Sequence, residues 1–576
     1  MQIANPVLTG FNPDPSIIRV EDKYYIANST FEWFPGVQIH ESTDLVNWTL
    51  ISHPLDTIKK LDMDGNVDSG GIWAPDLSYA DGRYWLVYTD VKVVNGAFKD
   101  CTNYLTTADD IRGPWSDPIT LNGVGFDASL FHDDDGRKYL VQMVWDFREY
   151  KNPVGGIKLT EYDPKSEKLL PRTAKVIYHG SAVKLTEGPH IYKLFGQYYL
   201  FCAEGGTAFS HHETVSRSND LWGPYKEQPG EAFLTAFGAP DNYLQKCGHG
   251  ALVDTPDGEW YFAHLCGRPL HRPLASKYEP RGYCTLGRET AIQKVTFDAD
   301  YWPHIVGGRQ GQQFVEAPKS ANAHNADCNG NASIQNEICK NTPISANSNG
   351  NNLSTFATTD THPKVTHRYG FDEDKLDINL NTLRIPFTDR IGSLSAVPGS
   401  LRLYGKGSLS NTHEVAFVAR RWQAFEFVAE TKVKFDPYTF QQMAGLVNFY
   451  NTEHWSFIHV THDETLGRAI ELSQMDNGVY TSFLRDKAIA IPDDIEYVYF
   501  RSEVHATSYK YSYSFDGVTY TALDIELDAT ILSDDYIMEG NNSGCFTGAF
   551  VGLAAVDIAG YNLEADFAYF VYDENL

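Results

Sequence analysis

The chain has 576 residues, enough for two to four domains of about 100 to 200 residues, which excludes a short peptide-like scaffold. Its 75 acidic residues outnumber 47 basic ones, and the net charge of −28 repels phosphate backbones, so nucleic acid is not an expected partner. No stretch approaches about 18 consecutive apolar residues and the N-terminus lacks a signal-peptide pattern, so no membrane partner is expected. The eight cysteines form no CxxC pair, which favours free thiols and a cytoplasmic location.

A repeat covers the first three hundred residues. In each unit a small or acidic residue begins a short apolar strand, a turn follows, and an aromatic residue of the next strand comes 10 to 12 residues after the start. The five units begin 53 to 62 residues apart, at Asp14, Ala74, Asp127, Glu187 and His249. Pairs such as Asp81-Gly82 and Asp257-Gly258 are typical of hairpin turns. These features predict an all-β fold that starts with a five-bladed β-propeller over residues 1–317.

The propeller predicts that residues far apart in the chain meet at its axis. Equivalent positions on the innermost strands converge on one channel mouth, so Asp14, Asp127, Glu187 and His249 are expected together, with Ala74 leaving a gap on the second blade. Taken singly, each acid is equally well explained as a turn former or a strand-end residue. Like charges in one pocket raise one another's pKa, so acids at the same repeat position in three blades favour a functional role.

Three converging carboxyl groups suit hydrolysis of a glycosidic bond. That reaction needs an acid to protonate the leaving oxygen and a second carboxylate on the other face of the sugar. Glu187 has the longer side chain and is expected next to Asp127, which predicts a proton held towards neutral pH and the role of general acid. Asp14, expected across the channel and away from that pair, is predicted to stay ionised and to activate water.

Aromatic and charged side chains near the inner strands are candidates for sugar contact. Four aromatic residues lie just before or after inner-strand segments, where loops face the channel: Phe31, Trp33, Trp73 and Trp145. Each of them also suits an ordinary core position. Arg288 is predicted either to grip sugar hydroxyls or to orient a carboxylate, with a salt bridge as the alternative. His249 fits a packed core histidine as well as a sugar contact or a ligand of a channel ion.

The motifs around these residues resemble the β-xylosidases of glycoside hydrolase family 43. They are NPDPS, STFEWFPGVQIH, DSGGIWAPDLSY, GFDASLFHDDDG, TEGPH, QKCGHG and LGRETAIQK. The resemblance spans the first three hundred residues and resumes in the last two hundred. It implies an inverting, exo-acting enzyme that releases D-xylose from the non-reducing ends of β-1,4-xylo-oligosaccharides, often with α-L-arabinofuranosidase activity.

The resemblance also implies a role for each site residue. These roles are general base for Asp14, pKa modulator for Asp127, general acid for Glu187, substrate-gripping arginine for Arg288, sugar contacts for Phe31 and Trp73, and channel histidine for His249. Trp145, which lies next to an inner-strand segment, is predicted as a further substrate contact. Inversion implies room for water between base and acid, so their carboxyl groups are expected roughly 6.5 to 9.5 Å apart. A homodimer or homotetramer is implied as well.

The sequence contains no cluster of transition-metal ligands, and paired carboxylates need no cofactor for this reaction. We therefore expect no required cofactor and no metal at the catalytic residues. A structural calcium ion in the propeller channel near His249 remains an alternative.

The second half of the chain predicts a different β architecture. From about Phe371 long alternating strands such as FEFVAETKVKF indicate a β-sandwich over residues 366–576. The resemblance implies a concanavalin-like sandwich that closes the active site through SGCFTGAFVG, with Phe546 as the plug and Cys545 where relatives usually carry phenylalanine. A sandwich that only stabilises the protein is the alternative. Residues 318–365 are rich in asparagine and predict a surface insert or linker.

Two other functions compete with the xylosidase. A non-catalytic sugar-binding propeller would use the aromatic residues and treat the acids as hydrogen-bond acceptors. A hydrolase with the same chemistry would act mainly on α-L-arabinofuranosides, because the two sugars present similar shapes to such a pocket.

Overall fold

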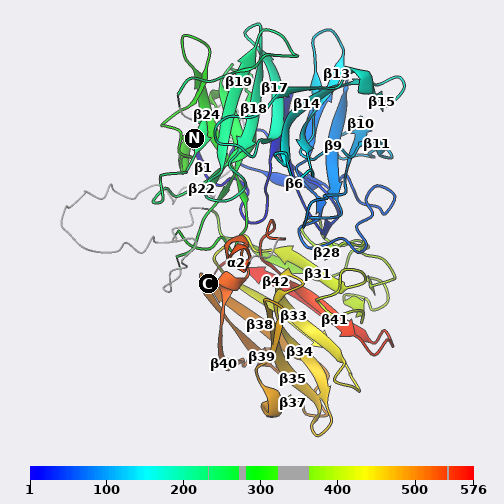
Figure 1. The fold of residues 1–576 in the computed structure, drawn as a ribbon. Coiled ribbons are helices and arrows are strands. Elements are labelled where there is room, and N and C mark those ends of the chain that lie inside the picture. The colour runs from blue at the N-terminus through cyan, green and yellow to red at the C-terminus, as the bar shows by residue number, and fades with distance from the viewer. Residues whose placement is uncertain (231, 272–280, 322–361, 541–543, 576) are drawn as a thin grey trace, which may run out of the picture.

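The computed structural model describes residues 1–576 except 231, 272–280, 322–361, 541–543 and 576. Two β-rich bodies lie one above the other, with the N-terminal half of the chain in one and the C-terminal half in the other (Figure 1). Most of the predicted insert, residues 322–361, lies outside the described residues. Among the residues that are described, no helix is both long and apolar enough to cross a membrane. The six described cysteines are free and buried.

The N-terminal body is the predicted five-bladed propeller, with one antiparallel sheet per repeat unit. The first two blades contain β2 (Ser16–Val20), β3 (Lys23–Asn28), β5 (Gln38–Ser42) and β6 (Thr49–Ser52), then β7 (Gly71–Ile72), β8 (Asp76–Ala80), β9 (Arg83–Val91), β10 (Cys101–Ala108) and β11 (Ile119–Asn122). The third contains β12 (Ser129–His132), β13 (Lys138–Trp145), β14 (Val154–Asp163), β15 (Lys168–Leu169) and β16 (Lys175–Tyr178), with the 3-10 helix η1 (Pro171–Thr173). The fourth contains β17 (Glu187–Leu194), β18 (Gln197–Glu204), β19 (His212–Ser218), β20 (Lys226–Glu227) and β21 (Leu234–Thr235). The fifth contains β22 (Gln245–Asp254), β23 (Trp260–Gly267), β24 (Glu289–Phe297) and β25 (Pro303–Ile305).

The first strand of each blade lies at the propeller axis. A cavity of about 400 Å³ is lined by residues of β2, β8, β12, β17 and β22, so all five inner strands face one channel. The turns that join them to the second strands have the backbone the sequence predicted, with φ of 54° at Asp81 and 76° at Gly82. Strand β1 (Gln2–Ala4) pairs antiparallel with β26 (Phe314–Glu316), which joins the two ends of the propeller segment.

The C-terminal body is the predicted β-sandwich of two antiparallel sheets. One sheet contains β27 (Thr366–Tyr369), β29 (Gly392–Ser393), β30 (Leu401–Tyr404), β32 (Glu426–Lys434), β38 (Val498–His505), β39 (Ser508–Ser514), β40 (Thr521–Asp528) and β42 (Glu564–Asp573). The other contains β28 (Asn381–Leu383), β31 (Ala416–Arg421), β33 (Gln442–Asn451), β34 (His454–Asp463), β35 (Gly467–Asp476), β36 (Val479–Ser482), β37 (Ile489–Ala490) and β41 (Phe550–Asp557). Alternating side chains such as Phe427, Ala429 and Val433 of β32 are buried between the sheets, as the sequence pattern requires. The remaining elements are η2 (Arg485–Lys487), η3 (Ala529–Ile531) and α2 (Asp534–Glu539).

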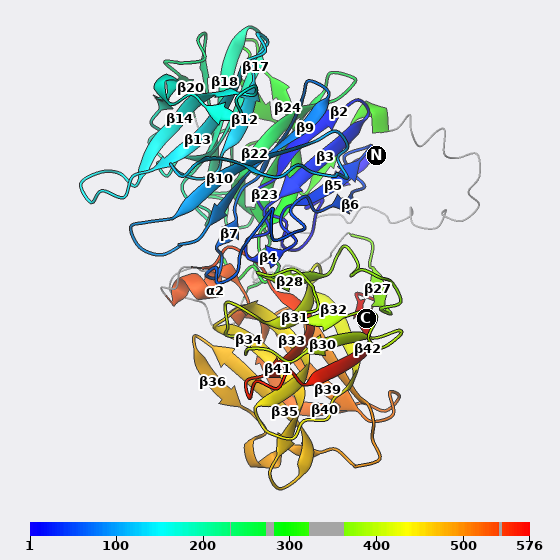
Figure 2. The same cartoon turned by 90° about the vertical axis from the view of Figure 1, so that its right-hand side faces the viewer.

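One strand from the propeller segment extends a sheet of the sandwich. Strand β4 (Trp33–Phe34), from the connection inside the first blade, pairs with β28 so that Phe34 lies opposite Thr382. Trp33 is fully buried and stacks on Phe550 with 3.6 Å between ring centroids. Trp33 is therefore a core residue between the two bodies, the alternative that the sequence left open, and the shared sheet fixes the sandwich against the mouth of the propeller (Figure 2).

Candidate active site

The predicted site residues occupy strained backbone positions at the starts of inner strands. Asp14 precedes β2 with a φ of 51°, Asp127 precedes β12 with a φ of 50°, and His249 within β22 has a φ of 47°. Phe31, in a loop of the first blade, has a φ of 48°. Left-handed backbone is uncommon for residues other than glycine and costs of order 1–3 kcal/mol per residue, so the surrounding fold must impose it.

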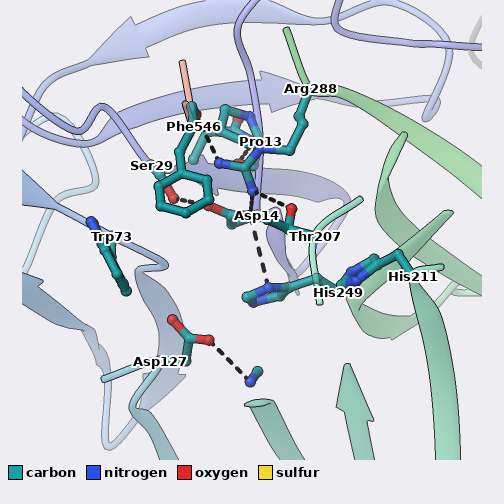
Figure 3. Close-up of polar contacts among 12 residues, drawn as sticks. Pro13, Asp14, Ser29, Trp73, Asp127, Thr207, His211, His249, Arg288 and Phe546 are labelled. Atoms are coloured by element: carbon teal, nitrogen blue, oxygen red, sulfur yellow. Dashed lines mark hydrogen bonds and ion pairs between the residues drawn. The ribbon is translucent and has the colours of Figure 1, made fainter. Parts of the chain in front are cut away.

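Asp14 lies at the centre of the site (Figure 3). Its carboxylate accepts hydrogen bonds from Ser29 Oγ at 2.6 Å and from Arg288 Nη1 at 2.8 Å, and His249 Nδ1 lies 3.8 Å from Oδ1. Burial by itself would raise the pKa of Asp14, but the charge of Arg288 and the hydrogen bond from Ser29, with a further contribution from His249 when its imidazole is protonated, lower that pKa below its ordinary value. Asp14 is therefore held as a carboxylate.

The other two acids have the opposite ionisation. Burial, followed by the charge of Asp14, raises the pKa of Glu187 to about 7, although Arg288 opposes the shift. Burial, followed by the charges of Glu187 and Asp14, raises the pKa of Asp127 well above its ordinary value, and Asp127 Oδ2 accepts a hydrogen bond from Gly188 N at 3.2 Å. The expectation that Asp14 lies across the channel from this pair stays a prediction, but its charge reaches both of them.

Arg288 joins the acids to the sandwich. It immediately precedes β24, and its Nη1 donates to Thr207 Oγ1 at 3.1 Å as well as to Asp14. Nη2 donates to the main-chain oxygen of Phe546 at 2.8 Å, and the guanidinium carbon lies 5.4 Å from the Phe31 ring centroid. Arg288 therefore forms an ion pair with Asp14, which fits both the predicted role of orienting a carboxylate and the salt-bridge alternative.

Aromatic rings form a continuous wall beside the acids. Phe31 and Trp73 have ring centroids 6.2 Å apart, and Phe546 of the sandwich lies 6.0 Å from Phe31 and 5.8 Å from Trp73. Trp73 also contacts Phe126 at 4.8 Å, and Phe126 contacts Trp145 at 6.2 Å. The structure thus brings the predicted contacts Phe31, Trp73 and Trp145 together with the predicted plug Phe546, and adds Phe126, which precedes Asp127 in the GFDAS motif.

The comparisons with known proteins agree with this geometry. Residues 3–303 match Glycosyl hydrolases family 43, and residues 368–573 match the Beta xylosidase C-terminal Concanavalin A-like domain. The chain belongs to glycosyl hydrolase family 43. It is therefore a glycoside hydrolase, and the mouth of the propeller is its candidate active site.

Relatives of this family 43 enzyme match it over almost their whole length. A "Beta-xylosidase" of Bacillus subtilis is 51% identical and covers 100% of both chains. A "Xylosidase/arabinosidase 43B" of Humicola insolens is 42% identical over 99% of this chain and 97% of its own. The crystal structure of a xylan beta-1,4-xylosidase from Bacillus halodurans has a TM-score of 0.87 at 44% identity, covering 99% of this chain and 100% of that one.

Several residues of the family 43 site were missed in the sequence. Thr207 contacts Arg288, and the buried His211, whose pKa burial lowers to about 3, donates from Nδ1 to the Gly206 carbonyl oxygen at 2.7 Å. Both lie in the connection from β18 to β19, outside the strand-turn-strand segment that the repeat shares. No offset within the repeat therefore pointed to either residue.

The second blade also contributes an acid to the channel. Ala74 carries no polar group, as predicted, but Asp76 two residues later accepts hydrogen bonds from Ser16 Oγ at 3.2 Å and from Leu130 N at 2.8 Å. His190 Nδ1 lies 3.5 Å from Asp76 Oδ1. Ser16 and Ser129 occupy the same offset on two other blades, so comparing that position across the repeat would have revealed the aspartate.

The structure gives no support for the calcium ion considered near His249. Within the described parts of the chain, no group of three or more histidine, cysteine, aspartate or glutamate side chains is arranged to hold a metal ion. His249 instead faces Asp14, and burial lowers the pKa of its imidazole to about 4, so it is neutral at physiological pH.

Proposed function

We propose that this family 43 enzyme releases D-xylose from the non-reducing ends of β-1,4-xylo-oligosaccharides with inversion at the anomeric carbon. The observation that carries the proposal is the pair of opposite ionisation states in one buried site. Asp14 is held as a carboxylate by Arg288, while burial raises the pKa of Glu187 to about 7. A base and an acid with pKa values on either side of the working pH are what the reaction needs.

In the proposed reaction, Asp14 accepts a proton from a water molecule as the water oxygen bonds to the anomeric carbon. The bond from that carbon to the glycosidic oxygen breaks, and Glu187 delivers its proton to the leaving oxygen. Asp127 is proposed to modulate this acid, because the two carboxyl groups interact and the charge of Glu187 raises the pKa of Asp127. Solvent exchange then returns a proton to Glu187 and removes one from Asp14.

An exo mode of action is supported by the way the sandwich closes one side of the site. The Phe546 ring faces Phe31 and Trp73, its main-chain oxygen accepts from Arg288, and its main-chain N–H donates to Ser69 Oγ at 3.0 Å. Three rings and a guanidinium group therefore surround the space beside Asp14. We propose that they bind the terminal sugar, with Trp145 contacting the leaving sugar and His249 lining the pocket.

The test is xylose release from xylobiose by the wild type and by Glu187→Gln, which keeps the side-chain shape but cannot supply a proton. The variant is expected to lose about 10²- to 10⁴-fold in kcat, with a smaller loss on 4-nitrophenyl xyloside, whose leaving group needs less protonation. Proton NMR of the first product should show α-xylose, as inversion requires. A wild type that binds xylobiose without hydrolysing it would instead support a non-catalytic sugar-binding propeller.

A second candidate activity is hydrolysis of α-L-arabinofuranosides. It is favoured by the name of the Humicola insolens relative, "Xylosidase/arabinosidase 43B". Paired measurements of kcat/KM on 4-nitrophenyl β-xyloside and 4-nitrophenyl α-L-arabinofuranoside rank the two activities. The xyloside is expected to have the higher value, and the reverse order would make the protein mainly an arabinofuranosidase.

A further inference from the structure

Two phenylalanine rings are exposed together on separate loops of the propeller. Phe98 lies in the connection between β9 and β10, Phe147 lies in the connection between β13 and β14, and their side chains are 58% and 53% exposed. Their ring centroids are 4.9 Å apart with an interplanar angle of 37°. Both connections project from the same edge of the propeller (Figure 2). Neither ring contributes to a buried core, so packing alone does not explain the pair.

The exposed pair is joined to the active site through Trp145. The Trp145 indole donates to the main-chain oxygen of Ala97 at 2.7 Å, which fixes the residue before Phe98. Lys99, the residue after Phe98, places its Nζ 4.6 Å from the Trp145 ring centroid. Because Trp145 also contacts Phe126, the wall of rings beside the acids is connected to the exposed pair through the main chain on either side of Phe98.

The surroundings of the pair suit a carbohydrate. A xylose ring presents C–H groups that pack on an aromatic face and hydroxyl groups at its edge that need polar partners. Asp146 and Arg148, which flank Phe147, pair with each other at 2.7 Å between Nε and Oδ1, and Tyr150 in the same connection is 77% exposed. These groups place donors and acceptors next to the apolar surface. An uncharged sugar is also not repelled by a chain of net charge −28.

We propose that Phe98 and Phe147 form a binding platform for a distal xylose unit of the leaving chain, beyond the unit at Trp145. This inference rests on the proposed function and adds a preference for longer xylo-oligosaccharides to it. Substrates of three or more xylose units reach the platform, whereas xylobiose and 4-nitrophenyl xyloside end before it. The platform therefore raises kcat/KM only for the longer substrates.

The experiment compares kcat/KM on xylobiose, xylotriose and xylotetraose for the wild type, Phe98→Ala, and the double variant Phe98→Ala with Phe147→Ala. The double variant is expected to lower the ratio of either longer substrate to xylobiose by about two- to tenfold. Activity on 4-nitrophenyl xyloside is expected to stay at the wild-type level, which also shows that the variant is folded. Phe440→Ala is the matched control, because Phe440 is 61% exposed on the sandwich.

Unchanged ratios in an active double variant would overturn the platform. A second copy of this chain, rather than a xylose unit, could also cover the ring pair. The molar mass from light scattering distinguishes these two cases and also tests the predicted homodimer or homotetramer. A fall in mass with unchanged ratios would assign the ring pair to an interface between copies. A wild type inactive on 4-nitrophenyl xyloside would refute the proposed function itself, which is a different result from a lost preference for longer chains.

Discussion

A buried ion pair joins the propeller to the sandwich close to the active site, and its removal should weaken the whole protein. Lys246 Nζ of β22 lies 2.7 Å from Asp535 Oδ1 of α2, and the side chains are 0% and 3% exposed. Asp535 Oδ2 also accepts from Cys284 N at 2.8 Å. Although burial alone would lower it, the pKa of Lys246 is raised, chiefly by the charge of Asp535, so its ammonium group keeps its proton.

The expected magnitude follows from the burial of both charges. In Asp535→Asn the amide oxygen can still accept from Cys284 N, but the ammonium of Lys246 is left buried without its charge partner. Breaking a buried pair in this way costs about 3–5 kcal/mol of unfolding free energy. At roughly 2–4 °C per kcal/mol for a domain of about 200 residues, Tm should fall by at least about 6 °C. The double variant Lys246→Met with Asp535→Asn buries neither charge, so its loss should be clearly smaller than the sum of the two single losses.

Urea unfolding followed by tryptophan fluorescence measures these losses for the wild type, both single variants and the double variant. The matched control is Lys59→Met, which breaks an exposed pair with Asp117 at 2.6 Å whose side chains are 72% and 63% exposed. Such a surface pair contributes about 0–1 kcal/mol. A loss for Asp535→Asn as small as the control, or losses that add within about 0.5 kcal/mol in the double variant, would refute the reasoning.

The same variant should also affect catalysis, because α2 is connected to the residue that follows Phe546. Tyr450 donates its hydroxyl hydrogen to Asp534 Oδ1 at 2.5 Å, and the same hydroxyl oxygen accepts from Thr547 N at 3.3 Å. A displaced α2 would therefore displace the ring that closes the site. Asp535→Asn is expected to raise KM for xylobiose more than it lowers kcat. An unchanged KM in the destabilised variant would show that the closing residue is held by other contacts.

The acids of the site predict a bell-shaped dependence of kcat/KM on pH, with activity lost as Asp14 gains a proton at a pH below the ordinary range of an aspartate and lost again around pH 7 as Glu187 loses one; constant activity from pH 6 to 9 would contradict this assignment. Burial raises the pKa of Glu187 from 4.5 to about 7, so the wild type loses stability as the pH rises between these values, whereas Glu187→Gln does not. Urea unfolding gives the free energy of unfolding of Glu187→Gln minus that of the wild type, and this difference should be up to about 3 kcal/mol larger at pH 8 than at pH 4. An equal difference at both pH values would argue against a raised pKa of Glu187. Phe546→Ala removes ring contacts with Phe31 and Trp73 but keeps the main-chain oxygen that accepts from Arg288, so steady-state kinetics on xylobiose should show a higher KM with a smaller change in kcat; a loss confined to kcat would disprove this role.

The sequence by itself determined the propeller and the set of converging acids, and the reason is geometric. A repeat that closes on itself brings equivalent positions to the same distance from one axis, so the offset shared by Asp14, Asp127 and Glu187 was enough to predict that they meet. The alternation of apolar residues in strands such as β32 similarly predicted a sandwich, because side chains of a strand alternate between its two faces. Asp76 lies within the repeat as well, and was missed only because another offset was compared.

Other features depend on contacts between residues that no repeat relates, and only the tertiary structure decided them. Thr207 and His211 lie in a connection outside the repeated strand-turn-strand segment, and Lys246 meets Asp535 only because the sandwich docks on the propeller. Trp33 became part of a sandwich sheet for the same reason. The ionisation of the acids was also decided by the tertiary structure, because a pKa reflects burial and every nearby charge together. Asp14 is ionised because Arg288 lies against its carboxylate, and Glu187 holds its proton because desolvation and the charge of Asp14 raise its pKa.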